Sequence, residues 1–318
     1  MMLRRRLLIG WVLGGVLSVA QAQIVRLPDA ACAEPGSGGD GFEESSPSWP
    51  SLGSGGVVGS GSRFIAVPGL EGDPAYGARR YFWFVPTLAV PAPIPLVVLL
   101  HGTAGSPSNA QNEARIVRDL WVDTATRHGF AVVAPVAGSS RGSWIVPDAA
   151  GDAPTDYDVI AAAVQDLETR HDIERARRYV WGFSAGGHVA LDLVLNPLHA
   201  GFGRRQFAAV AVNAGTLAGL ACAGLTDAEC RSALRDAFPR LPIQVVVGDA
   251  DPLRTHAEGD IGRFLGQGWV VPNTYRHVTF EGGHWVDPAH PDLHWDWLCR
   301  FGRRLDPIER FRLRPPVP

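Results

Sequence analysis

A serine surrounded by small residues is the clearest chemical feature of this chain. Gly182-Phe183-Ser184-Ala185-Gly186 fits the pattern Gly-x-Ser-x-Gly, between a buried strand-like run, Tyr179–Trp181, and a helical run, Ala185–Leu195. At a sharp strand-to-helix turn, glycines leave room for close backbone contacts and the serine hydroxyl projects from the turn. The alternative is a glycine-rich helix start in which Ser184 is an ordinary N-cap. The strand–turn–helix context favours Ser184 as a nucleophile.

A serine hydroxyl reacts only when a neighbouring base accepts its proton, so the chain should supply a histidine. His284 follows two glycines at the end of a short strand, where a loop can carry an imidazole over the sheet edge. His277 lies within the strand pattern, and His290 and His294 lie in or next to the last helix, where packing roles are favoured. We therefore predict that His284 is the base. Because base catalysis requires a neutral imidazole, activity should fall at acidic pH.

Two aspartates compete for the role of the acid that orients the histidine. The buried strand Ile243–Val247 runs into Gly248-Asp249-Ala250-Asp251-Pro252, so both carboxylates follow the carboxyl end of a strand. We favour Asp251, because Pro252 fixes its turn and the extra residues let it reach past the strand end. Asp249 is then a turn former that uses its side-chain hydrogen bonds.

A glycine-rich loop, His101-Gly102-Thr103-Ala104-Gly105, follows the apolar strand Leu96–Leu100. Such a loop allows the main chain to approach a substrate oxygen closely. We predict an oxyanion hole formed by the backbone N–H groups of Thr103 and Ala185, the residue after the nucleophile. The alternative is an ordinary strand-to-helix turn.

Three aromatic residues lie in or next to these loops and are candidates for a substrate pocket: Trp144, Phe183 and Trp285. Simple packing is an equally good interpretation of each. A metal site is disfavoured, because the chain has no Cys-x2-Cys pair and the spacing of His284, His290 and His294 lacks a second motif. The expected chemistry needs no cofactor and no metal.

The elements that position these residues alternate between strand and helix. Two β-rich runs, Arg63–Val67 and Arg80–Val85, resemble an antiparallel pair. Buried strands and helices then follow each other, which indicates a mostly parallel sheet with helices on both faces. The predicted strands are Leu96–Leu100, Phe130–Ala134, Tyr179–Trp181, Phe207–Val212 and Ile243–Val247, and the predicted helices are Ala110–His128, Thr155–Arg170, Ala185–Leu195 and Pro291–Arg304. Thr155 and Asp158 have the spacing of a capping box.

The two ends of the chain differ from its body. Residues 1–22 combine three arginines, a short apolar run and an Ala-x-Ala end, which predicts a cleaved secretory signal peptide and a secreted or periplasmic protein with no membrane association afterwards. An uncleaved anchor is the alternative, although the run is short for a membrane span. Residues 23–62 read as a Gly/Ser/Pro-rich lead-in, residues 63–305 as one catalytic domain, and residues 306–318 as a proline-rich tail.

Export changes the interpretation of the four cysteines, because disulfides form in oxidising compartments. Cys222 and Cys230 are close in sequence and are expected to pair, which leaves Cys32 with Cys299. Three pairings are possible, and this one is preferred.

Composition excludes several function classes. The chain has 318 residues and a net charge of −3, and all 29 of its basic residues are arginine. The lack of lysine excludes Schiff-base chemistry on a lysine and a P-loop lysine. No basic run in the body of the chain is suited to nucleic acid. The negative charge also argues against strongly anionic substrates.

Taken in order, HGTAG, GFSAGG, GDADP and GGHW resemble the α/β-hydrolase superfamily. Within it, the chain resembles secreted poly(3-hydroxybutyrate) depolymerase and feruloyl esterase-like serine esterases, through Tyr157-Asp158-Val159, Arg178-Tyr179-Val180-Trp181 and GGHW. The resemblance spans about Ser62–Arg304 and implies a triad of Ser184, Asp251 and His284. Two departures are Thr103, where the group often has cysteine after His-Gly, and the lack of a separate polymer-binding module after the hydrolase domain, which argues against attack on insoluble polyester.

The resulting expectation is a secreted serine carboxylic ester hydrolase that acts on a small-molecule or oligomeric ester through an acyl-enzyme on Ser184. Two alternatives remain open. A serine peptidase or acyltransferase would use the same three residues. A non-catalytic binding protein with the same fold would usually lack one of them.

Overall fold

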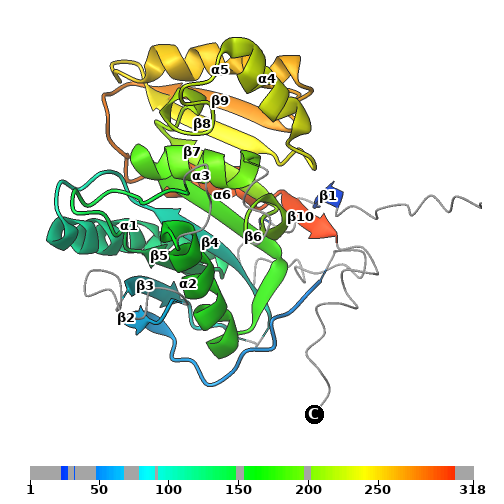
Figure 1. The fold of residues 1–318 in the computed structure, drawn as a ribbon. Helices are drawn as coiled ribbons and strands as arrows, with labels where there is room; N and C mark the ends of the chain where they lie inside the picture. The colour runs from blue at the N-terminus through cyan, green and yellow to red at the C-terminus, as the bar shows by residue number, and fades with distance from the viewer. Residues whose placement is uncertain are drawn as a thin grey trace, which may run out of the picture.

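The centre of the molecule is a twisted sheet of eight strands in the order β2-β3-β5-β4-β6-β7-β8-β9 (Figure 1). The computed structural model describes residues 23–27, 32, 48–67, 79–89, 92–147, 154–196 and 202–304. Strands β2 and β3 pair antiparallel, β3 pairs antiparallel with β5, and all later neighbours are parallel. The strands are β2 Gly59–Ile65, β3 Arg79–Val85, β4 Ile94–Leu100, β5 Ala131–Pro135, β6 Ile173–Phe183, β7 Ala209–Asn213, β8 Ile243–Gly248 and β9 Tyr275–Phe280.

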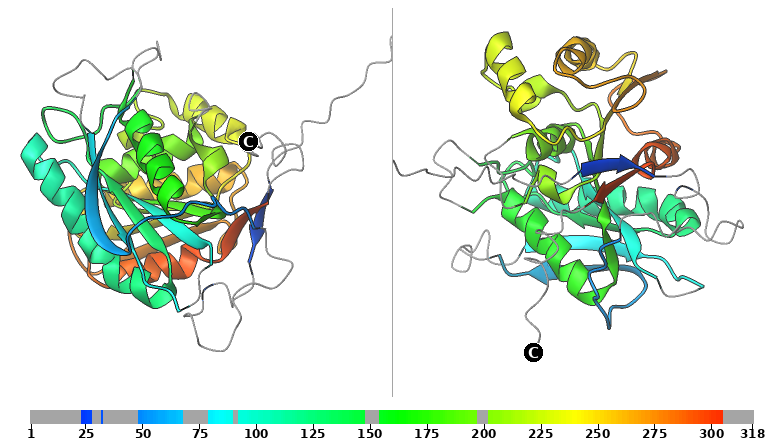
Figure 2. Two further views of the ribbon diagram at one scale, coloured as in Figure 1. Left: turned by 90° about the horizontal axis from the view of Figure 1, so that it is seen from below. Right: turned by 90° about the vertical axis from the view of Figure 1, so that its right-hand side faces the viewer.

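Helices cover both faces of this sheet (Figure 2). They are α1 Pro107–His128, α2 Asp156–Arg170, α3 Ala185–Leu195, α4 Asp227–Asp236, α5 Arg254–Gly266 and α6 His290–Leu298. Residues of α1 and α6, such as Trp121 and Trp295, are buried in one core cluster. Residues of α2, α3, α4 and α5, such as Ile160 and Leu193, are buried in the other. The sheet therefore separates two apolar layers, as predicted.

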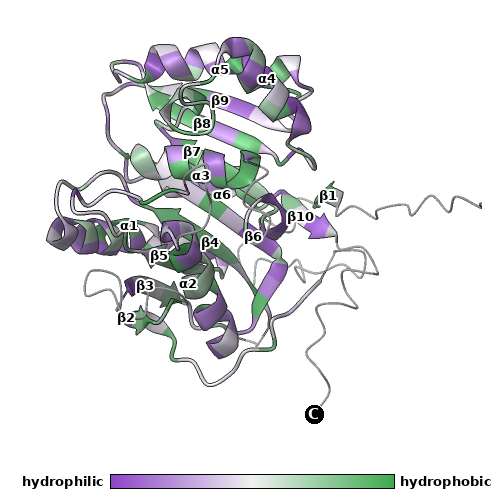
Figure 3. Ribbon diagram, viewed as in Figure 1, coloured by the Kyte–Doolittle hydropathy of each residue, from purple (hydrophilic) through white to green (hydrophobic). Residues whose placement is uncertain are grey.

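The hydrophobic pattern explains this arrangement. Every residue of β4 and β5 is buried, as expected for parallel strands that are covered on both faces. Figure 3 shows β4 as mostly hydrophobic, whereas β6 and helices α1, α2 and α5 carry both hydrophobic and hydrophilic residues. Such helices bury one face against the sheet and leave the other to solvent.

One cap ends α1 and another begins α2 where the sequence indicated. Gly129 adopts a left-handed conformation, with φ of 68°, and ends α1. Thr155 and Asp158 form the predicted capping box of α2. The Thr155 side chain accepts a hydrogen bond from the backbone N–H of Asp158, and the Asp158 side chain accepts one from the backbone N–H of Thr155. Both caps satisfy backbone groups that a helix end leaves unpaired.

Two predicted boundaries differ from the structure. The last helix ends at Leu298 rather than Arg304, and Phe301–Arg304 forms strand β10, which pairs antiparallel with β1, Gln23–Arg26. The predicted lead-in also extends too far, because β2 begins at Gly59 and Ser51 N–H donates to the carbonyl of Ile173 on β6. Small residues of this segment pack against α2, since a Cβ at Gly53 would lie 2.1 Å from the carbonyl oxygen of Glu168. Helices α4 and α5 were not predicted at all.

Two disulfides join Cys222 to Cys230 and Cys32 to Cys299, which confirms the preferred pairing. The second bond ties the N-terminal segment to the end of α6, across 267 positions of sequence. Residues 1–22 and 306–318, predicted as signal peptide and tail, lie outside the described residues. Among the helices that the structure describes, none has the length and apolar character to cross a membrane.

Candidate active site

Ser184 lies at a strained turn between β6 and α3. Its backbone φ of 52° and ψ of −119° are unusual for a residue with a side chain. A Cβ at Gly182 would lie 2.1 Å from the carbonyl oxygen of Gly186, and one at Gly186 would lie 2.1 Å from that of Leu100. The turn therefore requires glycine at both positions, which is the reason for the spacing in the sequence.

The structure brings Ser184, His284 and Asp251 together, although they are far apart in sequence. Nε2 of His284 lies 2.9 Å from Oγ of Ser184, and Nδ1 lies 2.9 Å from Oδ2 of Asp251. Oδ1 of Asp251 accepts a hydrogen bond of 2.8 Å from the backbone N–H of Leu253, so the carboxylate is fixed at both oxygens. Asp251 is only 6% exposed, whereas His284 is open to solvent. The three groups form a continuous hydrogen-bonded series with the hydroxyl at its accessible end.

The competing carboxylate, Asp249, does not face the imidazole. Its Oδ1 accepts a hydrogen bond of 2.9 Å from the backbone N–H of Gly282, in the loop that carries His284. The residue is exposed. Asp249 thus holds the glycine turn before His284 and does not contact the ring.

The glycine-rich loop after β4 packs directly against Ser184, the candidate nucleophile. A Cβ at Gly102 would lie 3.3 Å from Cβ of Ser184, so only a very small residue fits there. The N–H of Ala185 belongs to the first turn of α3, where helix donors have no acceptor inside the helix. The N–H of Thr103 has no backbone acceptor within the described part of the chain. The Ala185 N–H directly follows Ser184 and the Thr103 N–H belongs to the loop that packs against it, and the oxyanion hole formed by these two donors stays a prediction.

His101 and Trp144 support this loop from below. Nε2 of His101 accepts a hydrogen bond of 3.1 Å from the N–H of Ala137, and Nδ1 lies 2.7 Å from the carbonyl of Gly102. Burial lowers the pKa of His101 to about 4, so the ring is neutral at physiological pH. The Trp144 indole, 8% exposed, donates a hydrogen bond of 2.8 Å to the carbonyl of His101. Trp144 is therefore buried and hydrogen-bonded to this loop, and its role in a substrate pocket stays a prediction.

The other two aromatics named from the sequence lie beside the histidine. The ring of Phe183 is 5.0 Å from that of His284, centroid to centroid. Trp285 is 52% exposed, and it lies over the backbone of Gly282 and Gly283, where added Cβ atoms would meet its ring. Phe183 is thus placed at the reacting groups, and Trp285 offers an apolar surface to solvent next to them.

A buried polar network behind the nucleophile was missed by the sequence analysis. The Asn213 carbonyl accepts a hydrogen bond of 2.9 Å from the Ser184 N–H, and its side-chain Nδ2 lies 2.9 Å from Nδ1 of His290. Its Oδ1 contacts Nε2 of His294 and accepts from the indole N–H of Trp181. Burial lowers the pKa of both His290 and His294, which favours the neutral form of each ring. The only sequence signal was the polar residue at the end of an otherwise apolar run, Phe207–Val212.

Within the described residues, no group of three or more His, Cys, Asp or Glu side chains is arranged to hold a metal ion. His290 and His294 are occupied by Asn213, and they are not directed at a shared open position with His284.

Comparison with known proteins gives the fold. No protein-family model and no curated protein matches the chain. Among solved structures, a ferulic acid esterase is similar with a TM-score of 0.53 and 18% identity, over 77% of this chain and 99% of that one. The S-formylglutathione hydrolase of Agrobacterium tumefaciens is similar with a TM-score of 0.51 and 15% identity, over 78% of this chain and 98% of that one. The chain has the α/β-hydrolase fold.

The positions of the candidate residues agree with this fold. In α/β-hydrolases the nucleophile, acid and histidine follow each other in that order along the chain, with the nucleophile at a strand-to-helix turn. Here Ser184 follows β6, Asp251 follows β8 and His284 follows β9. The loop between β9 and α6, which carries His284, lies at the left of Figure 1.

Proposed function

We propose that this protein is a serine carboxylic ester hydrolase that acts through an acyl-enzyme on Ser184. The observation that carries the proposal is the series of two 2.9 Å contacts from Ser184 Oγ through the His284 ring to Asp251. The α/β-hydrolase fold adds support, because esterases are among its similar solved structures.

In the proposed cycle, Oγ of Ser184 attacks the ester carbonyl carbon while Nε2 of His284 accepts the hydroxyl proton. The N–H groups of Thr103 and Ala185 donate to the oxyanion of the tetrahedral intermediate. His284 then gives its proton to the leaving alcohol, and an acyl ester remains on Ser184. A water molecule repeats the sequence, releases the acid and restores the hydroxyl. Asp251 stays ionised and holds the proton of His284 on Nδ1.

The direct test is Ser184→Ala with p-nitrophenyl acetate and butyrate as substrates. We expect kcat/KM to fall by about 10⁴-fold or more, with an unchanged unfolding temperature, since only the hydroxyl is removed. A fluorophosphonate probe should label the wild type at Ser184 and leave the variant unlabelled. Turnover by the variant close to that of the wild type would remove Ser184 from the mechanism, and an unlabelled wild type would favour a binding protein.

A substrate panel separates the ester hydrolase from a peptidase or an acyltransferase with the same residues. The panel contains acyl esters from acetate to aryl acrylates, hydroxybutyrate oligomers, and peptides of matched size. We expect hydrolysis of esters and no cleavage of peptides. Transfer of the acyl group to an added alcohol in preference to water would indicate an acyltransferase.

We also propose that the protein is exported, with cleavage before Gln23. Support comes from the arginines and apolar run of residues 1–22 and from two disulfides, which persist in oxidising compartments. Expression of the full chain in a bacterium and mass determination of the exported protein test this. A chain that retains residues 1–22 would contradict it.

A further inference from the structure

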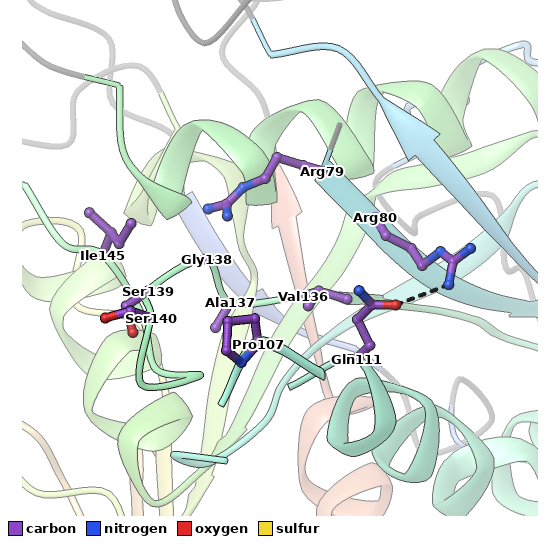
Figure 4. Close-up of a pocket in the computed structure, with 10 residues that line it drawn as sticks. All are labelled: Arg79, Arg80, Pro107, Gln111, Val136, Ala137, Gly138, Ser139, Ser140 and Ile145. Carbon is purple, nitrogen blue, oxygen red and sulfur yellow. Dashed lines mark hydrogen bonds between the residues drawn. The ribbon is translucent and has the colours of Figure 1, made fainter. Parts of the chain in front are cut away.

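A hollow of about 530 Å³ lies next to the oxyanion loop, outside the series of catalytic groups (Figure 4). Its walls come from three elements: Arg79 and Arg80 of β3, the first turns of α1 at Pro107 and Gln111, and the loop after β5 from Val136 to Ser140. This volume is within the range of small-molecule sites. Neither Ser184 nor His284 is among the residues of its wall.

The two arginines of the hollow differ in their charge balance. Arg79 is buried and forms an ion pair with the buried carboxylate of Asp156. Arg80 has no carboxylate within 4.0 Å among the described residues. Its Nη1 donates a hydrogen bond of 3.1 Å to Oε1 of Gln111, and its guanidinium lies 4.3 Å from the ring centre of Phe64.

Among the described residues, no carboxylate balances the charge of Arg80, which lies with Gln111 at one edge of the hollow (Figure 4). Its Nε is buried and has no hydrogen-bond partner among the described residues. Because protein atoms cover Nε, a ligand in the hollow would pair with the terminal Nη atoms of Arg80. A guanidinium offers a planar fork of donors that matches a carboxylate, which makes a carboxylate the best-suited partner. The exposed hydroxyl of Ser140, at the opposite wall in Figure 4, adds a further donor.

The hollow is connected to the candidate oxyanion loop by shared backbone. Ala104 N–H donates a hydrogen bond of 3.0 Å to the carbonyl of Gly142, and Thr103 Oγ1 lies 3.1 Å from Oγ of Ser143. Both partners belong to the loop whose earlier residues, 136–140, form the wall. Pro107, also in the wall, is four positions after Thr103. A group in the hollow and an ester at Ser184 are therefore separated by one loop.

We propose that this hollow is a subsite for a carboxylate on the part of the substrate remote from the scissile ester, with Arg80 as its ion-pair partner. The proposal rests on the ester hydrolase function and names a substrate class for it: esters that carry a carboxylate several bonds away from the reacting carbonyl. The net negative charge of the chain argues against strongly anionic substrates, whereas a single carboxylate meets a local positive charge here.

The test uses p-nitrophenyl monoesters of dicarboxylic acids from glutarate to sebacate, each paired with the methyl ester of its free carboxylate. We expect the wild type to prefer the free acid at one chain length, which measures the span from Ser184 to Arg80. In Arg80→Ala this preference should fall by about 10-fold or more, mainly through KM, since a charge-assisted hydrogen bond contributes to binding. Arg80→Lys, which keeps the charge, should retain part of the preference.

Arg115→Ala is the matched control, because Arg115 is an exposed arginine on α1 that is paired with Asp119. It removes the same net charge and should leave the preference unchanged. An equal loss for the free acid and its methyl ester in Arg80→Ala, or an equal loss in the control, would overturn the proposal.

Binding is measured separately by calorimetry, with monomethyl dicarboxylates added to Ser184→Ala and to Ser184→Ala/Arg80→Ala. Weaker binding in the double variant supports the subsite whatever the turnover. Absence of ester hydrolysis by the wild type would instead refute the proposed function, so the two failures are distinguishable.

Discussion

At the scale of single residues, the two aspartates after β8 show how one turn separates two roles. Asp251 contacts the His284 ring and is buried, while Asp249 is exposed and accepts from the Gly282 N–H. The sequence favoured Asp251 through Pro252 and through its greater distance from the end of the strand. It could not indicate what Asp249 contacts, because that partner is 33 positions away.

We predict that Asp251→Asn lowers kcat of ester hydrolysis by about 10⁴-fold, because an amide no longer holds the His284 tautomer. Asp249→Asn keeps an oxygen that can accept from Gly282 and should lower kcat by less than about 10-fold. Steady-state kinetics with one p-nitrophenyl ester compares the two. The reverse order of severity would exchange the two assignments.

The buried ring of His101 should make the free energy of unfolding depend on pH. Burial lowers its pKa in the folded protein to about 4, whereas an unfolded chain binds the proton near the ordinary value of 6.5. As the pH falls, the His101 ring of the unfolded chain therefore binds a proton before that of the folded protein does. The free energy of unfolding is highest above pH 6.5 and decreases as the pH falls to about 4. This decrease is about 3 kcal/mol.

The measurement is urea unfolding of the wild type and His101→Gln between pH 7.5 and 4.5, a window chosen around these values. Glutamine can still accept from Ala137 and does not titrate. The variant should lose less free energy of unfolding over this window than the wild type. Parallel curves for the two proteins would contradict the role of His101.

At the scale of elements, the turns were easier to predict than the elements around them. Gly182, Gly186 and the strand before them suffice to place Ser184, because no larger residue fits that turn. Continuous apolar runs likewise identified β4 and β5. Helices α4 and α5 were missed because each buries few residues, so the apolar residues that would mark them in the sequence are few.

The aromatic and polar side chains were harder to assign than the loops. For Trp144 the sequence favoured neither a pocket role nor simple packing, and it gave no sign that the indole N–H donates to the His101 carbonyl. Asn213 was overlooked for a similar reason. Its importance depends on contacts with α6 that only the packing of that helix against the sheet creates.

Asn213 provides a test of how the elements hold the site. Its carbonyl fixes the Ser184 N–H, and its side chain holds His290, which stands at the other end of the His284 loop. We predict that Asn213→Ala lowers kcat and the rate of fluorophosphonate labelling by about 10-fold, with little change in KM, and destabilises the fold by about 2–4 kcal/mol, because buried partners lose their hydrogen bonds.

Both rates are measured at a temperature where urea titration shows the variant to be folded, so that unfolding does not account for the loss. Asn112→Ala, an exposed asparagine that accepts a hydrogen bond from Arg115 on α1, is the control and should match the wild type. A purely structural role for Asn213 would change the unfolding free energy and leave the labelling rate of the folded protein unaltered.

At the scale of the whole molecule, the two disulfides close loops of very different size. Their sequence separations are 267 for Cys32–Cys299 and 8 for Cys222–Cys230. In the chain-entropy model a longer closed loop restricts the unfolded chain more. The long-range bond should therefore stabilise the fold by about 5 kcal/mol and the local bond by about 3 kcal/mol.

Thermal unfolding of Cys32→Ser/Cys299→Ser and Cys222→Ser/Cys230→Ser compares the two contributions. We expect the larger decrease in Tm for the first pair. Equal decreases, or a larger one for Cys222→Ser/Cys230→Ser, would show that the loop model does not describe this protein.

The pairing of β1 with β10 has a practical consequence for engineering. Gln23 is opposite Arg304, and this pair of strands lies at the right of Figure 1, away from the loop that carries His284. A short linker could therefore join these positions, and fresh termini could be opened at Gly224 and Leu225, in an exposed turn before α4. Such a circular permutant would keep the Ser184 cleft intact while freeing a remote surface for immobilisation.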